Sequence, residues 1–132
     1  MYVFVYGSLM RGYWNHPLLD NEKYAGTAMV KGYGLYNVAS YPGVVRREGA
    51  GVRGELYDVC DKTLAVLDQL EDEGDMYIRR AVTAETGEGE AEAFIYVWNG
   101  SVREDDYVPL EKLPWKPLKE RIAYGKGEDC DE

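Results

Sequence analysis

The hydrophobic and polar positions of the chain fall into short segments that mainly predict strands. Residues 2–6 are β-branched or aromatic throughout and are followed by Gly7, which predicts a short strand buried on both faces. Residues 26–36 predict a second strand, which a turn at 41–43 connects to a third at 44–45. Residues 51–59 alternate with period two, and residues 78–84 and 91–98 flank a polar, glycine-rich segment. These patterns predict a further strand and then a β-hairpin.

One segment has the spacing of a helix. Leucines recur at near-helical intervals over residues 64–70, Asp58 or Asp61 could cap the first turn, and Gly74 offers a C-terminal stop. Residues 10–21 mix Gly, Pro and Asn with a few apolar side chains and predict an irregular excursion. The order of strands, one helix and more strands, without an alternating βα pattern, predicts an α+β fold with a small curved sheet or barrel.

Length and composition are those of one domain. The 132 residues are 45% hydrophobic, enough for a single core, and we place the domain at residues 1–126. Prolines at 109, 114 and 117 interrupt the C-terminal third, which leaves room for a short helical segment at 118–124. Residues 127–132 are acidic and poor in apolar side chains, which predicts a flexible tail.

Charge and cysteine content narrow the class of protein. A formal net charge of −9 argues against nucleic acid and anionic membranes as partners, because both require clustered Lys and Arg. The two cysteines are too few for a disulfide scaffold and have no metal-binding spacing. No leader pattern and no stretch of about 20 apolar residues is present. We therefore expect a soluble, cytosolic protein, and the sequence leaves its oligomeric state open.

The loop after the first strand is a candidate binding element. Gly7 allows a sharp turn in which successive backbone N–H groups of Tyr6, Gly7, Ser8 and Leu9 could hold one anion. The alternative is an ordinary turn that ends a strand. Ser8 is a weak candidate nucleophile, because His16, the single histidine, lies in a proline-containing loop with no sign of a catalytic triad.

Glu71 is the candidate catalytic carboxylate. It follows Leu67 by four residues and Leu64 by seven, so it shares the apolar stripe that should face the sheet. Burial and the C-terminal end of the helix would both raise its pKa toward neutrality. The alternative is an exposed acid at the end of the helix, among several other acidic residues.

Two further patterns are set aside. The acidic residues at 68–75 match no calcium loop, so we expect no metal site there. The glycines of 49–54 formally match a dinucleotide fingerprint, yet they lead into a strand and not a helix. Glycines at a bulge or a close strand approach explain this second pattern better.

An ordered set of short motifs resembles the γ-glutamylcyclotransferase-like family, particularly the branch that includes γ-glutamylamine cyclotransferase and the plant avirulence-induced proteins. The resemblance covers about residues 2–98 and rests on the segments 3–10, Gly12, Asn15, 32–36, 41–43, 54–59, 67–71, 77–79 and Val82. It departs from the family at Asp72, where members commonly have Gly, and beyond Trp98, where little matches.

The resemblance implies a small mixed β-barrel flanked by a few helices, and an enzyme that releases 5-oxoproline from a γ-glutamyl substrate without a metal or cofactor. It implies that Glu71 is the general acid/base and that the loop at Tyr6, Gly7, Ser8 and Leu9 binds the substrate carboxylate. Tyr77 and Arg79 match motif positions too, as candidate pocket residues or as a wall aromatic and a structural ion pair.

Two alternatives remain at this level. The chain could be a non-catalytic small-molecule binding protein on the same fold, since fold alone does not establish activity. It could also be a γ-glutamyl amide hydrolase, which would use the same carboxylate with water. The leaving amine is not specified by the sequence.

Overall fold

The computed structural model describes residues 1–117. The expected helical segment at 118–124 and the expected acidic tail at 127–132 lie outside the described residues, as does the C-terminal boundary of the predicted domain. Along the described chain the elements are β1 (Tyr2–Val5), η1 (His16–Leu19), β2 (Lys23–Asn37), β3 (Pro42–Asp58), α1 (Asp61–Leu70), β4 (Tyr77–Thr86), β5 (Gly89–Trp98), η2 (Glu104–Asp106), β6 (Tyr107–Val108) and η3 (Leu110–Lys112).

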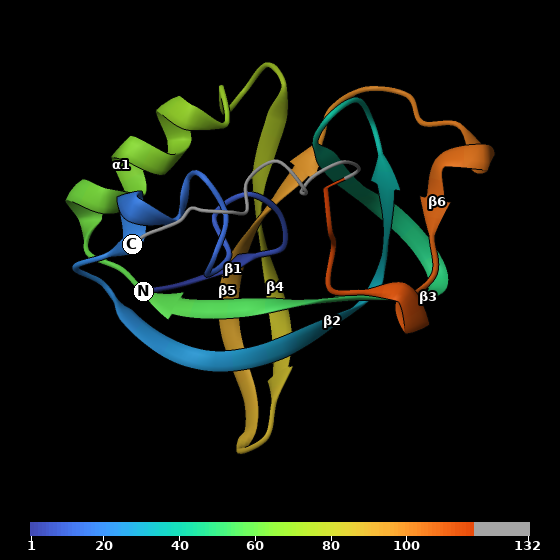
Figure 1. The fold of residues 1–132 in the computed structure, drawn as a ribbon. Coiled ribbons are helices and arrows are strands. Elements are labelled where there is room, and N and C mark those ends of the chain that lie inside the picture. The colour runs from blue at the N-terminus through green and yellow to red at the C-terminus, as the bar shows by residue number, and fades with distance from the viewer. Residues whose placement is uncertain (118–132) are drawn as a thin grey trace.

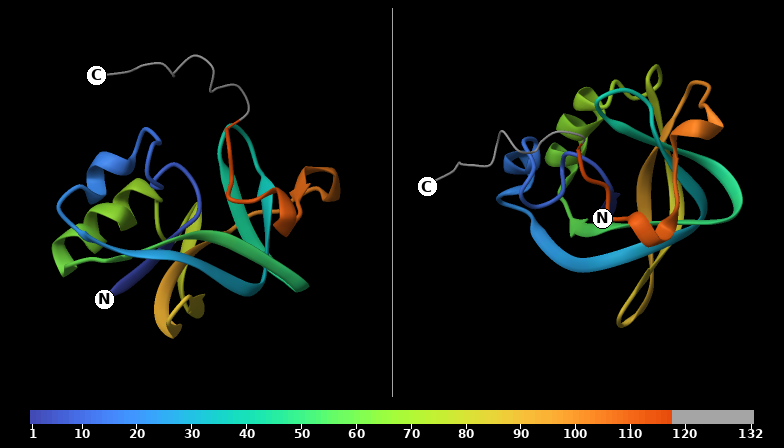
Figure 2. Two further views of the ribbon diagram at one scale, coloured as in Figure 1. Left: turned by 60° about the horizontal axis from the view of Figure 1, so that its bottom comes forward. Right: turned by 45° about the vertical axis from the view of Figure 1, so that its right-hand side comes forward.

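The strands form a closed, mixed barrel (Figures 1 and 2). Their order is β3-β1-β5-β4-β2, and pairing of β2 with β3 closes the ring, while the short β6 adds to β2. The contact between β1 and β5 is parallel, at Val3 and Phe94, and the other pairings are antiparallel. Beside the barrel lie α1 and, next to it, the short η1 (Figure 1). The predicted fold class, a small mixed β-barrel with few helices, is confirmed.

The predicted hairpin is present as β4 and β5, which pair in register from Tyr77 with Trp98 to Thr86 with Gly89.

The strands between β1 and α1 differ from the prediction. The strands expected at 44–45 and 51–59 are one continuous strand, β3, which pairs with β2 along almost its whole length. The polar run at 46–50 hides this continuity in the sequence, but the backbone ladder does not need apolar side chains. A register shift between Lys31 and Tyr33, and Gly49 at a φ of 82°, let the long hairpin bend.

Gly54 shows why the glycine-rich segment belongs to a strand. A Cβ atom there would collide with the carbonyl oxygen of Val5 in β1 and with the ring of Phe4. The close approach of β1 and β3 therefore requires glycine at this position, as the interpretation of a strand approach anticipated.

The helix lies where it was predicted, but its N-cap differs from the prediction and it ends earlier. Cys60 occupies the N-cap position, with no side-chain cap, so neither Asp58 nor Asp61 caps the helix. Its last residue is Leu70, and Glu71 is the C-cap, whereas the sequence suggested a stop near Gly74.

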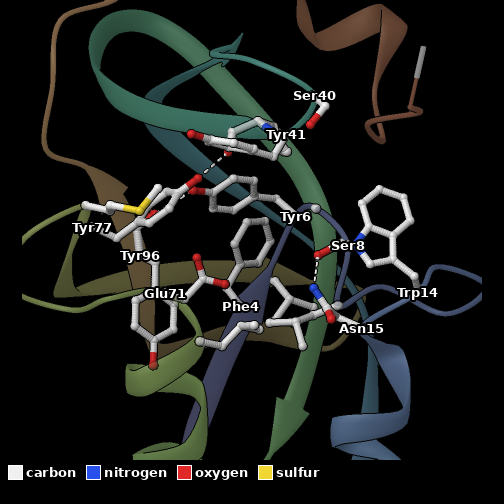
Figure 3. Close-up of a pocket in the computed structure, with 16 residues that line it drawn as sticks. Phe4, Tyr6, Ser8, Trp14, Asn15, Ser40, Tyr41, Glu71, Tyr77 and Tyr96 are labelled. Carbon is white, nitrogen blue, oxygen red and sulfur yellow. Dashed lines mark hydrogen bonds between the residues drawn. The ribbon is translucent and has the colours of Figure 1, made fainter. Parts of the chain in front are cut away.

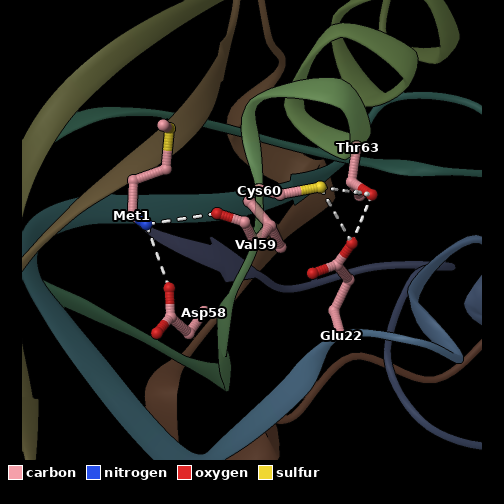
Figure 4. Close-up of polar contacts among 6 residues, drawn as sticks. All are labelled: Met1, Glu22, Asp58, Val59, Cys60 and Thr63. Atoms are coloured by element: carbon pink, nitrogen blue, oxygen red, sulfur yellow. Dashed lines mark hydrogen bonds and ion pairs between the residues drawn. The ribbon is translucent and has the colours of Figure 1, made fainter.

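The start of α1 is tied to neighbouring segments by polar contacts (Figure 4). The amino group of Met1 donates to Asp58 Oδ1 at 3.0 Å and to the Val59 carbonyl oxygen at 3.1 Å. The hydroxyl of Thr63 donates to the Glu22 carboxylate. These contacts hold the entry of the helix against both β1 and the start of β2.

Candidate active site

A cavity of about 250 Å³ opens where the C-terminal end of β1 meets the C-terminal end of α1 (Figure 3). Five parts of the barrel line it: the end of β1 with the loop that follows, the excursion before η1, the turn between β2 and β3, the segment from α1 to β4, and β5. Its sixteen lining residues are Phe4, Val5, Tyr6, Gly7, Ser8, Leu9, Trp14, Asn15, Ser40, Tyr41, Pro42, Leu70, Glu71, Met76, Tyr77 and Tyr96. The loop at 6–9, Glu71 and Tyr77 are thus brought to one place.

Glu71 carries the carboxylate of the cavity. As the C-cap of α1 it donates its backbone N–H to the Leu67 carbonyl at 2.9 Å. The backbone position of Glu71 is therefore fixed by the end of the helix. The carboxylate lies among the rings of Phe4, Tyr6 and Tyr96 (Figure 3). This partial burial raises the pKa of Glu71 from 4.5 to about 7, because a charged carboxylate is poorly solvated there.

Two buried tyrosines frame this carboxylate and are held by the backbone. The hydroxyl of Tyr6 donates to the Tyr96 carbonyl at 2.6 Å, and that of Tyr77 donates to the Pro42 carbonyl at 2.7 Å. Burial, with a smaller contribution from nearby Glu71, raises the pKa of both phenols well above 10. Both therefore stay neutral near pH 7 and serve as fixed walls of the cavity.

The loop at 7–9 is shaped by close packing and by hydrogen bonds to its carbonyl groups. A Cβ on Gly7 would lie 2.9 Å from Pro42 Cγ, so glycine lets the loop approach the turn between β2 and β3. The Gly7 carbonyl accepts from Met10 N and the Ser8 carbonyl from Asn15 N, each at 3.1 Å. Within residues 1–117, no hydrogen bond uses the N–H of residues 7–9 as a donor.

The hydroxyl of Ser8 is paired with a side-chain amide and not with a base. Asn15 donates from Nδ2 to Ser8 Oγ at 2.8 Å. The Nδ1 atom of His16 lies 3.0 Å from the Leu9 carbonyl oxygen, and this ring is absent from the cavity lining. No base therefore stands beside the Ser8 hydroxyl among the described residues.

Arg79 is not among the residues that line the cavity. Its Nε lies 3.1 Å from Asp68 Oδ1, and its guanidinium lies 4.7 Å from the centre of the Phe94 ring. The same Asp68 oxygen accepts the Tyr96 hydroxyl at 2.7 Å. Arg79 therefore takes the structural ion-pair position that the sequence offered as the alternative. The expectation of a pocket residue is corrected, because β4 turns this side chain toward α1.

Several lining residues were not singled out as site residues from the sequence. Tyr41, Tyr96 and Phe4 come from three separate elements, and Trp14 and Met76 lie in irregular segments. Asn15 and Tyr41 appeared as parts of the resembling motifs, and Tyr41 also in the predicted turn at 41–43, but neither was given a role in the site. No local pattern marks such residues, because they converge only when the barrel closes.

No group of three or more His, Cys, Asp or Glu within residues 1–117 is placed to hold a metal ion. Over the same range, every helix is too short or too polar to cross a membrane.

The fold and the site define a class: a small closed barrel with a cavity for a small molecule, in which a half-buried carboxylate has a pKa near neutrality. Comparison with known proteins is more specific. Residues 3–117 match the model of the family described as gamma-glutamyl cyclotransferase, AIG2-like. The chain belongs to this family, as the resemblance indicated.

Similarity to individual proteins agrees. A putative gamma-glutamylcyclotransferase from Methanocaldococcus jannaschii is 44% identical over 101 residues, which are 74% of this chain and 83% of that protein. The gamma-glutamylaminecyclotransferase of Mus musculus is 34% identical over 103 residues, 69% of this chain and 68% of its own. The crystal structure of an AIG2-like protein from Mus musculus superimposes with a TM-score of 0.73 at 25% identity, covering 85% of this chain and 86% of that one.

Proposed function

We propose that the protein is a γ-glutamylcyclotransferase-type enzyme that releases 5-oxoproline from a γ-glutamyl amine or peptide, with Glu71 as general acid/base. One observation carries the proposal. Glu71 is the single Asp, Glu, Lys, Arg or His side chain among the cavity-lining residues of the described chain, and burial brings its pKa to about 7. A general acid/base is most effective when its pKa lies near the working pH. Membership of the family supports the same reaction type.

The reaction needs one group that takes a proton and then returns it. The α-amine of the γ-glutamyl unit attacks its own γ-carbonyl, and Glu71 accepts the proton that this nitrogen loses as the new C–N bond forms. The tetrahedral intermediate then breaks the original amide C–N bond, and Glu71 returns a proton to the departing amine. Atoms and charges balance within substrate and enzyme, so the sequence of steps calls for no metal or cofactor.

The loop at residues 6–9 is proposed to hold the α-carboxylate of the glutamyl unit. Its three N–H groups at Gly7, Ser8 and Leu9 have no partner within the described residues, and the loop lines the cavity with Glu71. Backbone donors in a tight loop form an anion site. Because the ring closure is intramolecular, holding the chain in a folded rotamer supplies much of the acceleration.

The test is a product analysis by mass spectrometry. The protein is incubated with γ-glutamyl amines and γ-glutamyl peptides, and 5-oxoproline and glutamate are both quantified. We expect 5-oxoproline, and we expect kcat/KM to fall about tenfold for each pH unit below about 7, as the base with that pKa becomes protonated.

Two variants sharpen this test. Glu71→Gln should lower kcat by at least about a hundredfold, which is the usual contribution of a general acid/base. Asp72→Asn is the matched control, since Asp72 is the adjacent, exposed carboxylate outside the cavity, and it should retain activity. An active Glu71→Gln variant would refute the role of this residue. Glutamate in place of 5-oxoproline would indicate a hydrolase, and binding without any product would indicate a binding protein.

A further inference from the structure

A second carboxylate, that of Asp68, lies on the face of α1 that carries Glu71. Asp68 precedes Glu71 by three residues, and residues at this spacing are neighbours on a helix, with Cβ atoms about 5–6 Å apart. Its Oδ1 accepts the hydroxyl of Tyr96 at 2.7 Å, and the same oxygen lies 3.1 Å from Arg79 Nε. Asp68 therefore joins the helix to β4 and β5 directly behind the cavity.

Tyr96 carries the position of Asp68 into the cavity. In Figure 3 its ring lies beside the carboxylate of Glu71, while its hydroxyl points away from the cavity toward α1. Tyr96 is only 3% exposed, and its carbonyl accepts the hydroxyl of Tyr6. A buried hydroxyl that loses its acceptor is costly. The place of this ring against Glu71 therefore depends on Asp68 staying where it is.

Arg79 holds Asp68 in that place. The two side chains are 26% and 27% exposed, and Arg79 Nε is buried. The Arg79 guanidinium also lies 4.7 Å from the centre of the Phe94 ring, and its backbone N–H donates to Glu73 Oε2 at 3.2 Å. Without this cation a partly buried anion would be left uncompensated, and its side chain would turn toward water. Tyr96 would then lose its acceptor.

The same pair matters for the charge around Glu71. Within residues 1–117, the other titratable side chains that line the cavity are phenols: Tyr6 on β1, Tyr41 in the turn between β2 and β3, Tyr77 on β4 and Tyr96 on β5. Burial raises the pKa of the three phenols on strands well above 10, so these are neutral near pH 7. The acids at 72, 73 and 75 are exposed and screened by water. Asp68 is therefore the partly buried acid on the Glu71 face of α1, and Arg79 compensates its charge.

We propose that Arg79 is a positioning residue for Glu71, which keeps Asp68 bound to Tyr96 and compensates the negative charge of Asp68. This gives a role to a motif position that lies outside the cavity. Its effect on turnover rests on the proposed function, whereas its effect on the ionisation of Glu71 does not.

The first experiment follows the ionisation of Glu71 by the pH dependence of its side-chain ¹³C carboxyl signal. Arg79→Met leaves Asp68 uncompensated, and the midpoint should rise by about half a pH unit, because a like charge about one helical turn away disfavours the charged form. Asp68→Asn removes that charge and leaves Arg79, so the midpoint should fall. The double variant should lie close to the wild type.

Arg80→Met is the matched control for this titration, since Arg80 is the next residue of β4 and is exposed. It should leave the midpoint unchanged. Shifts of the same sign in Arg79→Met and Asp68→Asn, or no shift in either, would overturn the proposal. If Arg79→Met does not fold, Asp68→Asn decides by itself, because its midpoint must fall.

The second experiment uses steady-state kinetics, with the γ-glutamyl compound that gives the most 5-oxoproline as the probe. At a pH well above each midpoint, Arg79→Met should lower kcat about tenfold and change KM less, because a displaced acid/base slows the chemical step. Arg79→Lys should recover most of the loss, and Arg80→Met should match the wild type. In the Asp68→Asn background, Arg79→Met should have little further effect.

Additive losses in the double variant would refute the action of Arg79 through Asp68 and leave it a purely structural residue. Absence of 5-oxoproline with the wild type would instead refute the proposed function, and the titration of Glu71 would still decide the role of Arg79.

Discussion

Replacing Glu71 by Gln should stabilise the protein above neutral pH although, on the proposed function, it should lower the activity. In the folded protein the pKa of Glu71 is raised from 4.5 to about 7, so the folded state holds this proton more tightly than the unfolded chain does. Between these two pH values the folded state binds more protons, and the wild-type free energy of unfolding falls as the pH rises. The full penalty is present above about pH 7 and absent below about pH 4.5.

The magnitude follows from the same two values. At about 1.4 kcal/mol for each tenfold change in acidity, the rise from 4.5 to about 7 corresponds to about 3 to 4 kcal/mol at most. Glu71 is only partly buried, and solvent screening reduces the effect to about 2 kcal/mol. A glutamine has no such titration. The difference in unfolding free energy between the variant and the wild type should therefore increase by about 2 kcal/mol between pH 4.5 and pH 8.

Urea denaturation at intervals of half a pH unit measures this difference. The comparison of pH values removes any constant effect of the amide, because that contribution is the same at every pH. Glu88→Gln is the control for the removal of a carboxylate, since Glu88 lies in the exposed turn of the β4–β5 hairpin. A difference in unfolding free energy between Glu71→Gln and the wild type that is the same at every pH would refute the burial of the charged carboxylate. It would also remove the physical reason for its basicity.

Three further predictions concern the support of the site. Tyr96→Phe removes the hydroxyl that donates to Asp68 at 2.7 Å, and it should lower the free energy of unfolding by about 1 kcal/mol, measured by urea denaturation. In steady-state kinetics it should lower kcat more than it raises KM. Asp72 has a φ of 52°, so Asp72→Gly should be tolerated while Asp72→Val should cost about 2 kcal/mol; equal stability of the two variants would contradict this. Gly54→Ala should cost about 3 kcal/mol through a collision with the neighbouring strand, whereas Gly87→Ala, with open space around it, should cost little in thermal denaturation.

The departure from the family at residue 72 has a structural explanation. Members commonly have glycine after the glutamate, and Asp72 adopts the left-handed backbone conformation that glycine enters without strain. Aspartate tolerates this region better than most residues. Asp72 is exposed, and burial is what raises the pKa of Glu71.

Local pattern by itself determined the positions of most strands, the hairpin, the one helix and the inward position of Glu71. Each of these depends on periodicity within about ten residues, and periodicity is preserved whatever the rest of the chain does. The order of the motifs also indicated the family and drew attention to the loop at 6–9. The glycine of that loop has a structural reason, because the loop packs closely against Pro42 and a Cβ at residue 7 would collide with it. The substrate-binding role of that loop remains a proposal.

Only the tertiary structure decided what surrounds that carboxylate. The continuity of β3 depends on its pairing with β2, and the barrel depends on a parallel contact between β1 and β5, which are about ninety residues apart in sequence. Closure of the barrel brings Tyr41 and Tyr96 to the cavity and directs Arg79 to Asp68. It also leaves Leu70 exposed beside the cavity. Such positions follow from contacts between distant segments, which no local pattern in the sequence encodes.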